Sequence, residues 1–255
     1  MLFYKSWLET RWRFAIGLLL LAGSAVEVVF IYPKVMQLMP LVPMNGAGGE
    51  LGRRIREGAA LASTYRGYVW SQWMRQNLTQ MGTLFAVLLG TGGLVPQGSR
   101  GAALFTLSLP ASRSRLVGVR AAAGLAEFFV LAFVPCLLIP LLSPAVGESY
   151  ASGSAIVHGL CAFVAGAVFF SLALLLSTVF GDLWRPLLIT CAVAAALALC
   201  EPFVPGLARY GLFQVMSGAM YFRSGVLPWG GLGTSAAVTL ALLYAARINF
   251  ARHDF

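Results

Sequence analysis

Long apolar runs alternate with short polar stretches along the whole chain. A helix that crosses the hydrocarbon core of a bilayer needs about 20 mostly apolar residues, and the chain has six such runs. We therefore expect one all-α membrane domain over residues 1–255, with no appended soluble domain. The predicted spans are residues 13–32, 78–96, 117–143, 154–180, 185–204 and 228–247.

The composition agrees with a bilayer environment. Apolar residues make up 59% of the chain and charged residues 11%, whereas soluble domains carry about 25% charged residues. The formal net charge is +9, but the basic residues cluster at the ends of the apolar runs. That distribution is typical of membrane proteins rather than of nucleic-acid-binding ones, so we expect membrane lipids, and no nucleic acid, around the chain.

The distribution of basic residues also orients the predicted spans, because cytoplasmic loops carry an excess of arginine and lysine. With the N-terminus inside, most basic clusters lie on the inner side: before the first span, after the second and fourth spans, and in the C-terminal tail. We therefore expect both termini in the cytoplasm. The inner residues are Lys5, Arg11, Arg13, Arg100, Arg113, Arg115, Arg185, Arg247 and Arg252.

Residues 33–77 depart from this rule, because they would lie outside and yet are rich in arginine. Apolar and aromatic residues recur there at three-, four- and seven-residue steps, as on one face of a helix. The pattern predicts an amphipathic helix over about 50–77 that lies along the outer leaflet and leads into the second span. An ordinary structured loop is the alternative. The positions on this face are Leu51, Ile55, Ala62, Tyr65, Val69 and Trp73.

The cytoplasmic loop 97–116 has the sequence QGSRGAALFTLSLPASRSRL. Its first part favours a short amphipathic helix, which Pro110 would end because proline lacks an N–H. Ser112 is a suitable N-cap for the next helix, and Arg113 and Arg115 can hold carboxylates or phosphates through paired hydrogen bonds. The loop therefore has the features of a docking site; a hairpin that only fixes the topology is the alternative.

The stretch GAALFTLSLPASRSRLVGVR, residues 101–120, resembles a segment of the type GTL–LSLP–SR that follows the second span in type-2 ABC exporter permeases. These proteins are the membrane subunits of ATP-driven exporters in bacteria. The ending NFARHDF is similar to the basic ending of that family. The resemblance implies an inner-membrane location and a coupling helix at 98–116 that meets the ATPase. Its coupling residues would be Arg100, Leu107, Leu109, Pro110, Ser112, Arg113 and Arg115.

An ATP-binding P-loop is missing from the sequence. The motif GxxxxGK[ST] needs a lysine for the phosphates, but Lys5 and Lys34 stand in FYKS and YPKV. We therefore expect a transporter subunit that is not itself an enzyme and binds no cofactor directly. The resemblance implies that ATP is hydrolysed by a separate nucleotide-binding subunit. It also implies a second permease copy, in a homo- or heterodimer, and the substrate stays open between lipid, drug, peptide, polysaccharide and ion.

Two glutamates, Glu27 and Glu127, fall inside predicted spans. A charge at bilayer depth costs about 3 kcal/mol, so such residues are candidates for a translocation path or a dimer interface; polar packing between helices is the alternative. Glu127 follows Arg120 by seven residues, about 10 Å of helical rise, which suits one shared polar seam without direct contact.

Smaller features add to this picture. The stretch GTGG at 90–93 allows a close helix approach or a bend. The four cysteines lack CxxC spacing, so we expect packed thiols and no metal site. They are Cys136, Cys161, Cys191 and Cys200.

Two other classes of function compete with the exporter permease. The intramembrane glutamates allow an ion-coupled secondary transporter, although no inverted repeat is visible in the sequence. A membrane-embedded enzyme is the other class, but the sequence lacks HExxH and offers no Ser–His or acid-rich pair within the spans.

Overall fold

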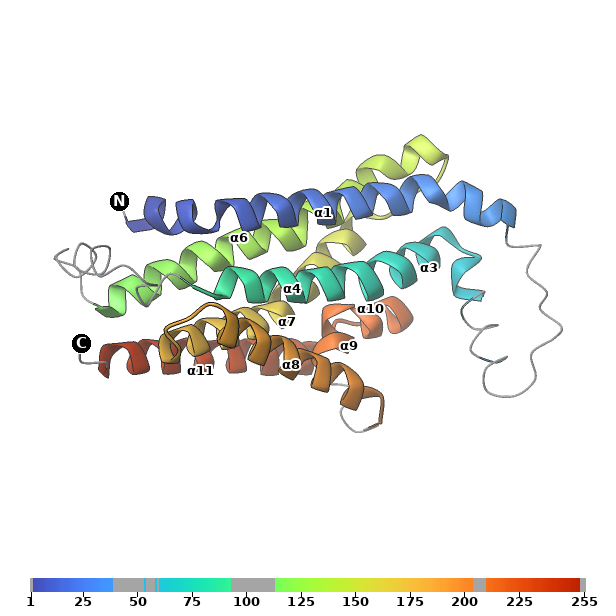
Figure 1. The fold of residues 1–255 in the computed structure, drawn as a ribbon. Coiled ribbons are helices and arrows are strands. Elements are labelled where there is room, and N and C mark those ends of the chain that lie inside the picture. Colours follow the sequence, from blue (N-terminus) through green and yellow to red (C-terminus); the bar gives the residue numbers. More distant parts are fainter. Residues whose placement is uncertain are drawn as a thin grey trace.

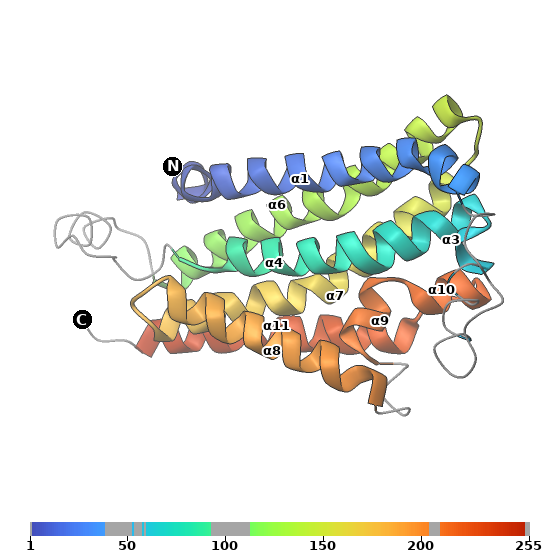
Figure 2. The same ribbon diagram turned by 45° about the vertical axis from the view of Figure 1, so that its right-hand side comes forward.

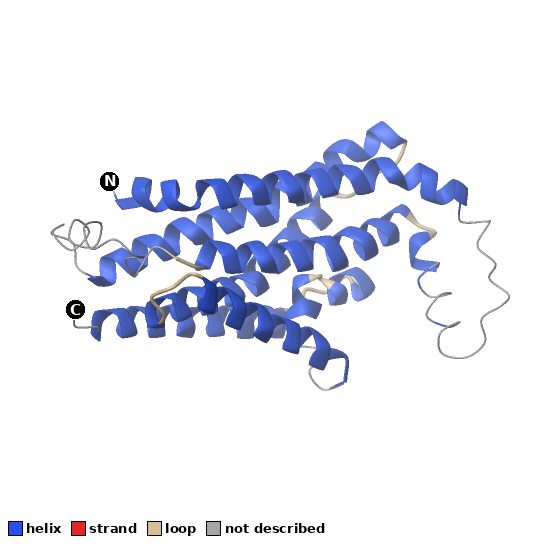
Figure 3. Ribbon diagram, viewed as in Figure 1, coloured by secondary structure: helices blue, strands red, loops and turns tan. Residues whose placement is uncertain are grey.

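The computed structural model describes residues 2–38, 53, 58, 60–92, 113–203 and 210–252, and this part of the chain is almost entirely helical, without strands (Figure 3). Its elements are α1 (Leu2–Leu38), α3 (Tyr65–Val69), the π-helix η2 (Trp70–Leu78), α4 (Thr79–Gly90), α6 (Arg113–Leu142), η3 (Ser143–Val146), α7 (Ser152–Val179), α8 (Trp184–Cys200), η4 (Glu201–Phe203), α9 (Leu212–Met216), α10 (Ala219–Ser224) and α11 (Trp229–Arg252).

The long helices lie side by side in one bundle (Figures 1 and 2). We call the end where α1 begins and α11 ends the proximal end, and the opposite end, which holds α9 and α10, the distal end. The C-terminal end of α4 and the start of α6 also lie at the proximal end (Figure 1). The two ends of the chain therefore lie at the same end of the bundle.

Helix α7 is the centre of the bundle, because it contacts α4, α6, α8, α9 and α11. Its buried face is rich in glycine, alanine and serine, and small residues let helix backbones approach closely. At Gly166, for example, an added Cβ would overlap the ring of Phe128. The sequence of α7 thus favours tight packing on several sides at once.

Four helical stretches are long and apolar enough to cross a membrane: Leu2–Leu38, Arg115–Val146, Ser152–Val179 and Trp229–Ala251. The prediction of an all-helical chain is confirmed for the described residues, and the four long apolar helices are compatible with a membrane protein. The first helix is longer than predicted, since it begins at Leu2 rather than at residue 13. The other two predicted spans correspond to shorter α-helices, α4 with 12 residues and α8 with 17.

The amphipathic helix predicted over 50–77 is not confirmed. Residues 50–52, 54–57 and 59 lie outside the described part, and from Tyr65 the chain is helical and continues without a break through η2 into α4. Trp70 and Trp73 are 1% and 0% exposed, and their indole N–H groups donate to Ser217 O and Ser24 Oγ. Buried indoles need such partners, so this stretch packs inside the bundle.

Candidate functional site

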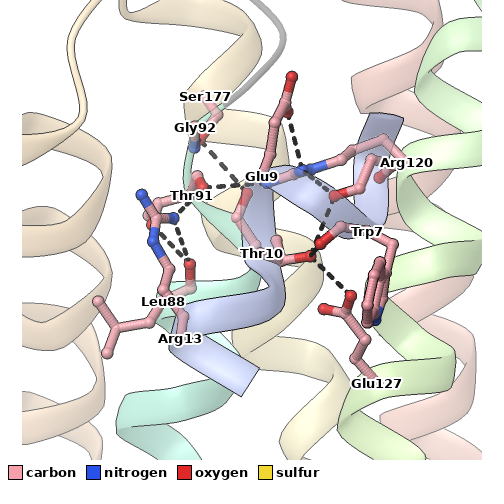
Figure 4. A network of polar contacts seen from close by, with 12 residues as sticks. Trp7, Glu9, Thr10, Arg13, Leu88, Thr91, Gly92, Arg120, Glu127 and Ser177 are labelled. Carbon is pink, nitrogen blue, oxygen red and sulfur yellow. Dashed lines mark hydrogen bonds and ion pairs between the residues drawn. The ribbon is translucent and has the colours of Figure 1, made fainter. Parts of the chain in front are cut away.

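A buried polar network surrounds the end of α4 at the proximal end of the bundle (Figure 4). It connects three helices that are far apart in the sequence, α1, α6 and α7, to the residues that follow α4. Its main members are Glu9, Thr10, Arg13, Thr91, Gly92, Arg120, Glu127 and Ser177.

The first part of the network caps α4. The last carbonyls of a helix have no partner within the helix, and here Arg13 Nη1 donates to Leu88 O and Thr91 O, both at 2.8 Å. A cation at this position also complements the helix dipole. Gly92 has φ +88°, a conformation that favours glycine, and its N–H donates to Ser177 Oγ of α7 at 3.3 Å.

Arg120 of α6 completes the cap from the other side. Its Nη2 donates to Thr91 O at 3.3 Å, so that one carbonyl accepts hydrogen bonds from two arginines. Its Nη1 pairs with Glu9 Oε2 of α1 at 3.2 Å. Arg120 is only 4% exposed, and a buried guanidinium is tolerated only when it has partners of this kind.

Glu127 extends the network toward the middle of the bundle. It is 7% exposed, and its Oε1 lies 2.6 Å from the hydroxyl of Thr10, which donates to it. Arg120 and Glu127 thus face the same neighbour, α1, and share one polar seam without a direct bond. The seam is confirmed, and the burial of Glu127 within this chain's own bundle matches the polar-packing alternative.

Glu27, the other predicted candidate, lies apart from this network. It is exposed on α1 and borders a groove with Tyr68 and Asn77. The two glutamates singled out in the sequence therefore have different surroundings.

Most of the predicted coupling residues lie outside the described part of the chain. These are Arg100, Leu107, Leu109, Pro110 and Ser112. Arg113 is the first residue of α6, directly after the predicted N-cap, and Arg115 is exposed in its first turn. The described part of the chain stops at Gly92 and resumes at Arg113, and Gly92 belongs to the network.

The partners that α1 contributes, Glu9 and Thr10, are not predicted from the sequence. The opening of the chain has the aromatic and basic composition of a surface segment, whereas it forms the first turns of α1. One signal was present: Glu9 and Arg13 stand four residues apart, on one helix face. A polar pair on one face of a helix can lie at a buried contact with another helix as well as on an exposed surface.

The hydroxyl of Thr10 gives a direct test of the seam. Thr10→Val keeps the shape of the side chain but leaves Glu127 Oε1 without its donor, and we expect a loss of about 1–3 kcal/mol in the free energy of unfolding. Thr10→Ser, which keeps the hydroxyl, is the matched control and should lose less. Equal losses in SDS titrations of the two purified variants would contradict the importance of this bond.

The contacts of this site connect helices to one another. Its bonds fix the position of the residues after α4 relative to α1, α6 and α7. Among the described residues, no three His, Cys, Asp or Glu side chains gather to hold a metal ion. Comparison of the chain with protein families, curated proteins and solved structures finds no match.

Proposed function

We propose that this chain is the membrane-spanning permease subunit of an ATP-driven ABC exporter. In this proposal α1, η2 with α4, α6, α7, α8 and α11 cross the bacterial inner membrane, with the proximal end and both termini in the cytoplasm. A separate ATPase subunit binds and hydrolyses ATP, and a second permease copy completes the transporter. The proposal follows from the loop that resembles the type-2 exporter family and from the geometry around that loop.

The observation that carries the proposal is the double hydrogen bonding of Thr91 O by Arg13 and Arg120. The predicted coupling segment, 98–116, follows Gly92 by a few residues in the sequence, and its last part is the start of α6 at Arg113. A push on this segment by an ATPase would therefore reach α1 and α6 through charged hydrogen bonds and α7 through Ser177. Coupling between distant sites needs a physical connection of this kind.

The lengths of the two shorter helices are compatible with six crossings. Helix α8 has 17 residues, which gives about 25 Å of rise, and a short span is accommodated by local thinning of the bilayer. Helix α4 is continuous with η2, so that the stretch from Trp70 to Gly90 is longer than α4 alone.

The experiment that tests the function is purification of the tagged chain from its native membrane in mild detergent, followed by mass spectrometry. The proposal expects a stoichiometric partner that carries a P-loop lysine. A monodisperse chain that co-purifies with no ATPase, and that transports in proteoliposomes without ATP, would contradict it.

The arginines at the start of α6 provide a sharper prediction. The double variant Arg113→Glu/Arg115→Glu should reduce the amount of co-purifying ATPase, or its stimulated activity, tenfold or more. The new carboxylates would repel the acidic groups that the two arginines are expected to hold. Membrane insertion should stay normal. Arg223→Glu, at the distal end of the bundle, is the matched control. If ATPase activity survives the double change, the docking assignment is wrong.

One observation favours an ion-coupled secondary transporter as a second candidate. Glu127 is a buried carboxyl group within a helix long enough to span a membrane, and such groups often serve as proton sites. Transport by the chain alone, driven by a proton gradient and lost in Glu127→Gln, would support this candidate over the exporter.

A further inference from the structure

A small polar groove opens on the surface between α1 and the helix that leads into α4. Its volume is about 230 Å³. Polar side chains from both helices line it: Glu27, Tyr68, Gln72, Gln76 and Asn77. Two apolar residues of α1, Val28 and Ile31, border the same groove.

The groove lies at membrane depth in the proposed topology. The apolar run of the first span ends at residue 32, so Glu27 is about 7.5 Å short of that end. The groove is lined at that depth by a carboxylate, a phenol and three carboxamides. In a bilayer, lipid or another molecule must cover them. Exposed polar side chains within a bilayer are costly and mark pathways or binding sites, so an occupant that supplies polar partners is expected.

The charge of Glu27 is not neutralised by a neighbour. Within the part of the chain that the structure describes, its carboxylate forms no ion pair and no hydrogen bond. Arg75, on the helix that carries Gln72 and Gln76, does not line the groove, and its guanidinium carbon lies 5.8 Å from the centre of the Trp70 ring. The groove therefore presents one net negative charge together with oxygen acceptors.

The chemistry of the lining selects an organic cation over a metal ion. Calcium and magnesium sites gather several oxygen ligands, usually with more than one carboxylate, whereas the groove offers a single carboxylate among amides. An ammonium group needs one counter-charge and a few acceptors, and both are present. The volume is below the roughly 300–1,000 Å³ of pockets that enclose a drug-sized ligand, so the groove holds a headgroup rather than a whole molecule.

We propose that this groove binds the ammonium head of a cationic amphiphile, with Glu27 as its counter-charge and the tail along Val28, Ile31 and the bilayer. The inference rests on the proposed function in one respect, because it names the substrate class of the exporter. Binding itself is a property of this chain alone and does not need the ATPase.

The test uses the full chain in phosphatidylcholine nanodiscs, with binding of dodecylammonium, which has N–H donors for the acceptors of the groove, measured for each variant. All variants share the same lipid background, so differences between them isolate the groove. Glu27→Gln should weaken binding about tenfold or more, because it removes the counter-charge, and Glu27→Asp, which keeps the charge, should stay within about threefold of the unchanged chain. Glu148→Gln, a glutamate outside the groove, should bind like the unchanged chain, and decyl glucoside should not discriminate between any of them.

Equal binding by the unchanged chain and Glu27→Gln would overturn the proposal. A Glu27 variant that binds the cation like the unchanged chain but no longer forms a dimer would also overturn the proposal. The occupant of the groove would then be a second copy of the chain. Loss of binding in Glu27→Gln, in a chain that co-purifies with no ATPase, would support the groove and contradict the exporter. Co-purification of the ATPase without cation binding would contradict the groove alone.

Discussion

Replacing Arg120 by methionine is expected to lower the free energy of unfolding by about 3 kcal/mol. The guanidinium is buried and pairs with Glu9 Oε2 while it donates to Thr91 O. Methionine fills much of the same volume but leaves both oxygens without this donor. The Arg120 side chain is 5% exposed and that of Glu9 is 36% exposed, and hydrogen bonds to charged groups contribute about 1.5–3 kcal/mol. Titration of the purified variant with SDS in mixed micelles measures the loss.

An exposed arginine in an ion pair is the matched control for Arg120. Arg185 pairs with Asp182 at 3.0 Å, but the two side chains are 69% and 42% exposed, and surface pairs contribute at most about 1 kcal/mol. Arg185→Met should therefore be nearly neutral. In the double variant Glu9→Gln/Arg120→Met the losses should not add, since both changes remove the same bond. Additive losses would show that the Glu9–Arg120 bond itself contributes nothing. Equal losses for Arg120 and Arg185 would show that the network adds nothing beyond a surface ion pair.

Gly90→Ala should destabilise the bundle by about 2 kcal/mol. An added Cβ would lie less than 3.0 Å from Phe170 O and from Ala173 Cβ on α7. A backbone carbonyl in the central helix cannot rotate away as a flexible side chain can, so α4 and α7 would have to separate, and overpacking of this kind costs about 1–3 kcal/mol. The loss should appear in the same SDS titration.

Gly118→Ala is the control for this second prediction. Gly118 lies in α6, and an added Cβ there meets nothing within 4 Å. Because alanine favours the helix over glycine by about 1 kcal/mol, this variant should be as stable as the unchanged chain or slightly more so. A comparable loss of stability in Gly90→Ala and Gly118→Ala would mean that a methyl group destabilises these helices without any close contact. The loss in Gly90→Ala would then no longer indicate a close approach of α4 and α7.

The apolar pattern alone predicts the long apolar helices of the described bundle. Helices α1, α6, α7 and α11 stand out because their apolar runs are long. The stretch before α4 is harder to interpret, since Gln72, Arg75 and Gln76 interrupt the run although Trp70 and Trp73 are buried. Polar residues on one side of a buried helix look the same in sequence as the polar face of a surface helix.

The candidate site was predictable only where its signals are local. The glycines at 90 and 92 and the spacing of Arg120 and Glu127 indicate a close approach and a shared seam, and both are present. The partners on α1 were missed, because a single sequence does not say which helix will face which. The capping of Thr91 by two arginines depends entirely on that choice of neighbours.

The long separation between the partners of the network has a consequence for biosynthesis. Glu9 and Arg120 are 111 residues apart in the chain, and ribosomes add about 5–20 residues per second. Glu9 therefore waits about 6 to 22 s after its own synthesis before Arg120 is synthesised, at the elongation rates just given. During this interval the Glu9 carboxylate stays hydrated, and its side chain is still 36% exposed once the ion pair has formed. Slower translation of α6 would prolong the period in which the nascent chain is open to degradation.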